Sequence, residues 1–292
     1  MRPAPGQSRS GRKTHDEKIR LLARDWRAWE HFAMRPGLRQ ALAAGVLVCV
    51  AGAGWAADRE AFLVGELKSC AACDLAGLDL HGRDLKRARL DGANLKGAVL
   101  ADASLFRAVL VRANLSAAKL AGANLNLADA KWADLSGADL SNALLYETDF
   151  SGANLAGANL QGARLGRARL NQADLRRANL AGADLTGARL AGAKLAGASL
   201  RAVKLNGQNL RGMDLRGIDF AAADMIEADL TGADLRGSDL SGVDLFGANL
   251  HGADLRGAKL DGARLTNAIL SDTQREGATF EDAIMPSGWG KD

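Results

Sequence analysis

Apolar residues recur along most of this chain with a period of five. From Leu75 to Leu270, leucine fills 36 of the 40 positions that lie five residues apart. The four exceptions are also apolar: Ala130, Phe150, Phe220 and Met225. An α-helix has 3.6 residues per turn, so a period of five would spread these side chains around its whole circumference. The pattern therefore excludes a helix and predicts short extended segments.

A single pentad, Ala153-Asn154-Leu155-Ala156-Gly157, illustrates the geometry that we expect. Its first and third residues are two apart, so on an extended segment they share one face, and the second and fourth point the other way. The glycine follows where a corner can use its permissive backbone. Each pentad is then one short edge plus a bend, and stacked edges form a solenoid in which each unit contacts mainly its neighbours.

The pentads resemble those of the pentapeptide-repeat family. Ala93-Asn94-Leu95-Lys96-Gly97 and Ala233-Asp234-Leu235-Arg236-Gly237 match its A(D/N)LxG motif, and the repeat covers residues 71–285. The resemblance implies an all-β fold, a right-handed quadrilateral β-helix with four pentads per coil and about ten coils, with the central Leu and the preceding Ala pointing inward.

A second repeat independently supports a four-sided coil. Asp-Leu-Arg-Gly occurs at residues 214–217, 234–237 and 254–257, which are spaced by twenty. Four pentads per coil place these motifs directly above one another, so the spacing predicts a stacked ladder of Asp and Arg side chains.

Residues 34–56 have the features of a secretory signal peptide. Arg35 and Arg39 precede an apolar run over residues 41–53, and Gly54-Trp55-Ala56 favours cleavage after Ala56. The apolar run is short for a membrane span. We expect a periplasmic or secreted protein without a stable membrane span, and an uncleaved signal that anchors the chain is the alternative. Residues 1–33 are then either a polar extension or lie upstream of a true start at Met34.

The two ends of the repeat need covering. Residues 57–70 contain an amphipathic stretch, 58–67, which predicts an N-terminal helical cap with Phe62, Leu63 and Leu67 on the rod end. At the other end, 286–292 is a loop-like tail. The apolar residues near it either fold over the last coil or pair two chains end to end: Phe280, Ile284, Met285 and Trp289. Both a monomer and an end-to-end homodimer stay open, and the resemblance implies pairing through the C-terminal end.

Charge is divided unevenly along the chain. The net charge is +4, but residues 1–56 hold ten Lys or Arg and four Asp or Glu, and residues 57–292 hold 28 and 30. The repeat is nearly neutral overall, which argues against nucleic acid as a partner. Some members of the family that the chain resembles mimic DNA and protect type II topoisomerases such as gyrase. That role requires a strongly acidic rod in the cytosol and is kept as the alternative function.

Few residues in this chain are candidates for disulfide formation, catalysis or metal binding. Cys70 and Cys73 are the disulfide candidates in an oxidising compartment, where a bond would pin the cap to the first coil; inert thiols and a redox or metal role are the alternatives. Only His81 and His251 remain after signal removal, and 170 residues separate them. We therefore expect no enzyme, no catalytic residue, no cofactor and no metal site.

Two departures from the repeat are specific to this chain. Four consecutive inward slots carry residues larger than alanine: Val203, Gln208, Met213 and Ile218. We interpret them as a locally widened coil in which the Gln208 amide needs an internal partner; drift compensated by neighbouring side chains is the alternative.

Outward slots also carry apolar residues, which form a candidate interaction patch: Phe106, Val109, Val111, Leu127, Trp132, Leu144 and Tyr146. Clustered exposed apolar groups mark interaction sites, whereas scattered ones are ordinary. The leading hypothesis is a non-enzymatic, exported scaffold or protein–protein interaction module whose protein partner is unknown.

Overall fold

The computed structural model describes residues 58–289. The predicted extension 1–33 and signal peptide 34–56, with the last three residues of the tail, lie outside the described residues. Within residues 58–289, no helix is long and apolar enough to cross a membrane.

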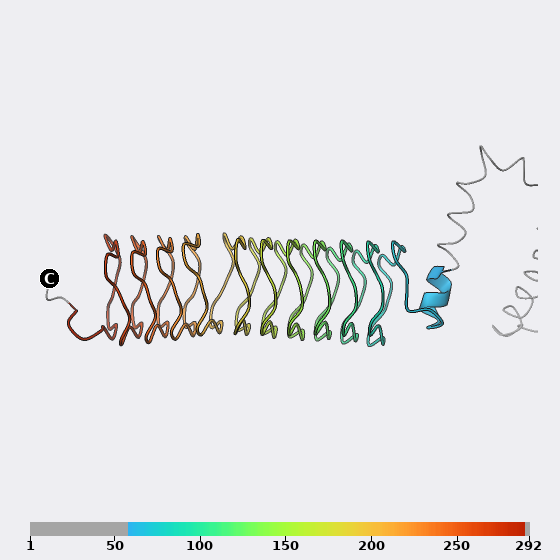
Figure 1. The fold of residues 1–292 in the computed structure, drawn as a ribbon, viewed down its shortest axis with the longest axis horizontal. Coiled ribbons are helices and arrows are strands. Elements are labelled where there is room, and N and C mark those ends of the chain that lie inside the picture. Colours follow the sequence, from blue (N-terminus) through green and yellow to red (C-terminus); the bar gives the residue numbers. More distant parts are fainter. Residues whose placement is uncertain (1–57, 290–292) are drawn as a thin grey trace, which may run out of the picture. The chain divides into compact units, whose positions relative to one another are not determined.

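The repeat forms a four-sided solenoid (Figure 1). Parallel β-bridges join residues twenty positions apart, from Ser69↔Arg89 to Arg264↔Ile284. Bridging residues recur at 69, 74, 79 and every fifth position to 284, so each side is one bridge and not a longer strand. An offset of twenty confirms four pentads per coil. The Leu rows and most of the Ala rows are buried in one core.

Each corner places one residue in the left-handed backbone region. Glycine is frequent there, as at Gly157 with φ of 66°, but Leu127 and Trp132 adopt the same conformation with φ of 61° and 59°. A Cβ atom makes this conformation costly, which is why glycine suits the corner. The solenoid imposes the bend at every pentad, whichever residue occupies it.

A short helix over 58–63 precedes the first coil. Phe62 is buried in the same core, and the helix is tied to the repeat because Arg83 Nη2 donates to the Leu63 carbonyl oxygen at 2.5 Å. The expectation that Leu67 also faces the rod end is wrong, since this side chain is exposed. The helix ends at residue 63, and Gly65, with φ of 85°, turns the chain before Leu67 is reached.

Cys70 and Cys73 form a disulfide, and both are buried. The Cys70 amide donates to the Arg89 carbonyl oxygen at 2.8 Å, so this cysteine already belongs to the pairing between coils. The bond therefore lies inside the first coil. It does not link the helix to that coil, in contrast to the sequence-based expectation.

At the C-terminal end, Trp289 lies against Phe280, with ring centroids 5.7 Å apart. Phe280, Met285 and Trp289 are partly buried against the core, whereas Ile284 is exposed. The tail thus folds back over part of the last coil. End-to-end pairing of two chains stays a prediction.

Coil pairing is interrupted in the middle of the repeat. Among residues 58–289, the bridges due between Arg189 and Asn209 and between Lys194 and Asp214 are missing, and Figure 1 shows wider spacing between the yellow and orange coils. The second coil of this pair along the chain, called the lower coil below, contains the bulky inward residues Val203, Gln208, Met213 and Ile218. The coil that precedes it is called the upper coil. The structure shows an opening between two coils here, named the breach below, and the widened coil stays a prediction.

Candidate functional site

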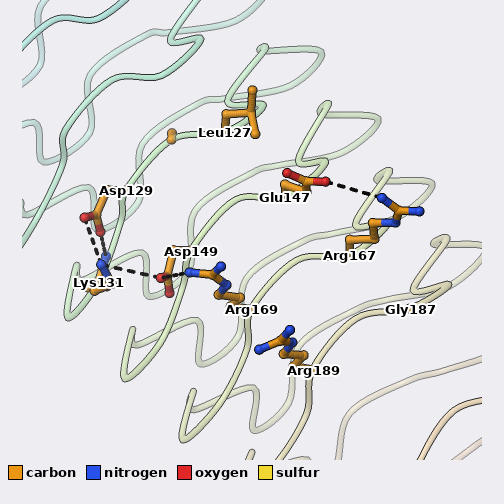
Figure 2. A pocket seen from close by; sticks show the side chains of 10 residues that line it. Leu127, Asp129, Lys131, Glu147, Asp149, Arg167, Arg169, Gly187 and Arg189 are labelled. Atoms are coloured by element: carbon orange, nitrogen blue, oxygen red, sulfur yellow. Dashed lines mark hydrogen bonds and ion pairs between the residues drawn. The ribbon is translucent and has the colours of Figure 1, made fainter.

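A groove crosses one side of the solenoid over four successive coils (Figure 2). Its volume is about 650 Å³. The lining residues come from two neighbouring columns of the repeat and the corner beside them: Leu127, Ala128, Asp129, Lys131, Glu147, Asp149, Arg167, Arg169, Gly187 and Arg189. Charged residues dominate the groove because these positions point outward in every pentad.

The floor of the groove is a chain of ion pairs. Lys131 Nζ lies 3.0 Å from Asp129 Oδ2 and 3.5 Å from Asp149 Oδ2. Asp149 Oδ2 is also 3.3 Å from Arg169 Nη1. The next residue of the same column, Arg189, has no ion pair within the described residues and is exposed. The row therefore ends in an unneutralised guanidinium.

Asp149 is the most buried charge of the groove, with 7 % of its surface exposed. Burial alone would raise its pKa. Hydrogen bonds from the Ser151 hydroxyl and backbone amide, the charge of Lys131 and the bond from Arg169 outweigh this effect, so the pKa lies below its ordinary value. The Lys131 pKa is raised, chiefly by its hydrogen bond to Asp129. Asp149 and Lys131 therefore stay charged at neutral pH.

The predicted apolar patch lies at the borders of this groove. Phe106, Leu127 and Tyr146 belong to one corner of successive coils, and Val111 and Trp132 to the next corner. Trp132 and Tyr146 are exposed, by 60 % and 41 %. The other members are half-buried: Phe106, Val109, Val111, Leu127 and Leu144. The structure thus shows two apolar corners that flank charged residues and not one continuous apolar surface.

Each exposed aromatic ring lies over a glycine of the next coil. A Cβ atom at Gly152 would overlap the Trp132 ring, and one at Gly166 would lie 3.3 Å from the Tyr146 ring. The Arg167 guanidinium carbon lies 5.9 Å from the centroid of the Tyr146 ring, within cation–π range, and Arg167 also pairs with Glu147 at 3.6 Å. The glycines make room that a standard side chain would remove.

The charged residues of the groove were missed by the sequence analysis. Their signal is the twenty-residue spacing of Asp129, Asp149, Arg169 and Arg189, which places them in one column once the coil length is known. The same logic was applied correctly to the second ladder, where Arg236 lies 2.6 Å from Asp234 and 3.5 Å from Asp254. That ladder of alternating Asp and Arg is confirmed.

The residues that line the groove include no histidine and no cysteine. No group of three His, Cys, Asp or Glu side chains that could hold a metal ion occurs in the part of the chain that is described. His251 lies outside the groove, where its Nδ1 is 2.9 Å from Ser271 Oγ and 3.4 Å from Asp272 Oδ2. The groove offers fixed charges between two apolar corners that carry the exposed rings of Trp132 and Tyr146.

The family model for pentapeptide repeats matches residues 73–110, 108–145, 133–172, 168–207, 209–242 and 248–285. This chain belongs to the pentapeptide-repeat family. The right-handed quadrilateral β-helix that the resemblance implied is the fold of that family. Its members are in general structural and interaction proteins and not enzymes.

Several solved structures are similar to this pentapeptide-repeat protein. HetL, which is involved in heterocyst differentiation regulation in the cyanobacterium Nostoc sp. strain PCC 7120, is 34% identical over 77% of this chain and 95% of its own, with a TM-score of 0.31. A pentapeptide repeat protein of the Arabidopsis thaliana thylakoid lumen is 31% identical over 42% of this chain and 68% of its own, with a TM-score of 0.28. QnrB1, a plasmid-mediated fluoroquinolone resistance protein, is 19% identical over 73% of this chain and 94% of its own, with a TM-score of 0.33. A comparison with curated proteins gives no significant match.

Proposed function

We propose that this pentapeptide-repeat protein is an exported, non-enzymatic module that binds another protein through the groove and its two aromatic corners. The observation that carries the proposal is the state of Trp132. Its backbone is left-handed, with φ of 59°, and its side chain is 60 % exposed. A left-handed backbone costs a residue with a Cβ atom about 1–2 kcal/mol.

The corner imposes the left-handed backbone of Trp132, as it does at Arg112 and Leu127, but folding does not explain why an exposed indole stands there. A glycine would fit the corner without strain, as Gly152 does in the next coil. Burial of the indole repays little of the cost because most of the ring stays in contact with solvent. Tryptophan and tyrosine are enriched among the residues that dominate binding energy at protein interfaces. A partner that covers both rings supplies the missing explanation.

The proposed partner is a folded or extended protein surface with apolar pockets for the two rings and complementary charge between them. Asp129, Lys131 and Asp149 neutralise one another in part, and Arg169 and Arg189 leave positive charge at one end of the groove. We expect the partner to present carboxylates toward that end.

Export is part of the proposal and rests on the signal-like segment over residues 34–56. The alternative is a cytosolic protein that mimics DNA and binds gyrase. The nearly balanced charge of residues 57–292 supports export and protein binding over that alternative, since a DNA mimic needs a strongly acidic surface. Fractionation of cells that express the full chain with a C-terminal tag tests this point. A cytosolic, uncleaved product that also inhibits or protects gyrase in a supercoiling assay would contradict the proposal.

The groove is tested by affinity capture from the envelope fraction with the full chain as bait. The double variant Trp132→Gly, Tyr146→Ser removes both rings, and Ile269→Ser removes an exposed apolar side chain in a distant coil as the matched control. We expect the wild-type and control baits to capture a partner that can be cross-linked to them. The double variant should lose this partner. Equal capture by all three baits would exclude the groove as the binding surface.

A further inference from the structure

The breach exposes backbone groups that every other coil pair uses for pairing. Elsewhere, amides at the central and corner positions donate to the next coil, as Leu170 N does to Arg189 O at 2.8 Å. Within residues 58–289, the corresponding amides of the upper coil have no such partner: Gly187, Leu190, Gly192, Leu195 and Gly197. Pairing is intact on both flanks, at Leu185 N to Lys204 O and Leu200 N to Asp219 O. The breach is therefore a sheet edge inside a closed solenoid.

The bulky inward residues account for where the breach lies. The amides of Asn209, Asp214 and Asp219 lack bonds to the upper coil in the described part of the chain, and each directly follows Gln208, Met213 or Ile218. Val203 does not interrupt the pairing. The next amide, Lys204 N, donates to Ala183 O at 3.0 Å, as in the intact coils. Met213 is half-buried in place of the usual buried alanine. A core packed around alanine has no room for three larger side chains in succession.

The breach contains a cavity of about 420 Å³, within the range of ligand pockets. Arg189, Leu190 and Gly192 line it from the upper coil, and Gln208, Arg211 and Met213 line it from the lower coil. Backbone donors, an apolar floor and guanidinium groups thus meet in one place.

A band of positive charge surrounds the breach. Residues 160–216 contain 11 Lys or Arg and 3 Asp or Glu, whereas residues 217–289 contain 5 and 13. Arg189 and Lys194 stand at the two bridging positions that have lost their partners, and both are exposed. Neither forms an ion pair with any described residue. Their charges are available to an anionic ligand beside the free edge.

We propose that the breach docks an extended acidic segment of a partner protein. The segment pairs its backbone with the free amides on the Leu190 side and places carboxylates against Arg189 and Lys194. Addition of a strand to an exposed edge supplies affinity through main-chain hydrogen bonds, and the flanking side chains supply specificity. The site adjoins the groove of the proposed function, with which it shares Arg189, and it does not depend on export.

Two other occupants fit less well. The chain's own residues 1–56 carry ten Lys or Arg and four Asp or Glu, so their charge opposes the band. The acidic residues 217–289 of a second copy are already paired into coils and offer no free extended strand. An acidic, extended segment of another protein satisfies both the backbone edge and the charge.

The direct test measures binding of a fluorescein-labelled peptide of alternating Glu and Val to the full chain by fluorescence anisotropy. A peptide of the same sequence with alternate backbone amides N-methylated keeps the charge and loses strand pairing. We expect the first peptide to bind and the second to bind at least about tenfold more weakly. Equal binding of the two peptides, or equal binding of single-stranded DNA of matched charge, would overturn the strand-docking proposal.

Variants separate the two parts of the site. Arg189→Glu with Lys194→Glu reverses the flanking charges and should weaken peptide binding by roughly tenfold. Lys119→Glu with Lys259→Glu makes the same change in net charge in distant coils and should leave binding unchanged. If both pairs weaken binding equally, the charge acts non-specifically and the proposal fails.

A third variant closes the breach. Gln208→Ala, Met213→Ala and Ile218→Ala restore the alanine rule, so the two coils should pair. Hydrogen exchange of the Leu190, Gly192 and Leu195 amides is fast in the wild type on this account and should slow in the triple variant. Peptide binding that persists when exchange shows closure would overturn the proposal. If exchange stays fast in the variant and peptide binding is unchanged, the three bulky side chains do not cause the breach.

Discussion

The side-chain amide of Gln208 donates a hydrogen bond to the carbonyl oxygen of Leu185, 2.5 Å away in the preceding coil. Thr148 makes the equivalent bond in an intact part of the solenoid, from Oγ1 to the Leu125 carbonyl oxygen at 2.8 Å. Both residues occupy slots that normally hold alanine and both are buried. A polar residue is thus accepted in this core where it reaches a carbonyl of the coil above.

Loss of either bond should lower stability by about 1 kcal/mol, the usual net value of an internal hydrogen bond. Gln208→Met and Thr148→Val keep the volume and remove the donor. The Leu185 carbonyl also accepts from the Ala188 amide at 2.9 Å, so it is not left without a partner. Denaturant unfolding of the two variants checks the value. No change in the free energy of unfolding for either variant would show that these bonds do not stabilise the fold.

Gly152→Ala should destabilise the protein more than Gly157→Ala does. Both glycines have positive φ, 68° and 66°, so both variants carry a backbone cost of about 1 kcal/mol. An added Cβ atom overlaps the Trp132 ring at Gly152 and meets nothing within 4 Å at Gly157. We expect roughly 1 kcal/mol of additional loss at Gly152. Adding Trp132→Gly should abolish the difference in a double-mutant cycle, and a difference that persists would contradict the contact.

Acid should weaken the groove through Asp149. Its folded pKa lies below the ordinary value of 3.8, because hydrogen bonds from Ser151 and the nearby cations outweigh the effect of burial. The contribution is therefore fully present above the ordinary value and is lost as pH falls through the lower, folded pKa. Asp149→Asn should flatten the loss of thermal stability below about pH 4. Lys131→Met should move that loss to higher pH, and an acid profile identical to wild type in both variants would contradict the assignment.

The redox state of Cys70 and Cys73 provides a test of the proposed export. After denaturation, exported protein should resist labelling of Cys70 and Cys73 by a maleimide until it is reduced, and protein retained in the cytosol should label without reduction. The bond closes a loop of four residues inside the first coil, so removing it by Cys70→Ala with Cys73→Ala should cost at most about 2 kcal/mol. Free thiols in protein recovered from the periplasm would contradict the expectation.

The repeat made most of the fold predictable. The leucine period, the inward alanines and the spacing of Asp214, Asp234 and Asp254 all follow from short-range geometry, and the four-sided coil and the Asp–Arg ladder were found as expected. The predictions for Leu67 and for the place of the disulfide failed. Both depended on how the chain leaves a helix of six residues, which no periodic signal specifies.

The candidate site was predictable only in part. Trp132 and Tyr146 were identified as outward aromatic residues, and they are exposed. The ion-paired row of Asp129, Asp149 and Arg169 was overlooked, since residues twenty apart appear unrelated until the coil length places them side by side.

By itself, the sequence determined the direction of each side chain, because a period of five combined with alternation leaves one arrangement of inside and outside. It also marked Gln208, Met213 and Ile218 as departures from alanine. Only the tertiary structure decided how the chain accommodates them. The lower coil keeps its pairing with the coil that follows and loses only part of its bonds to the coil above, so the amides of Leu190 and Gly192 have no backbone partner among the described residues. Which bonds are lost depends on how two whole coils pack against each other, and the sequence of a single pentad does not specify this packing.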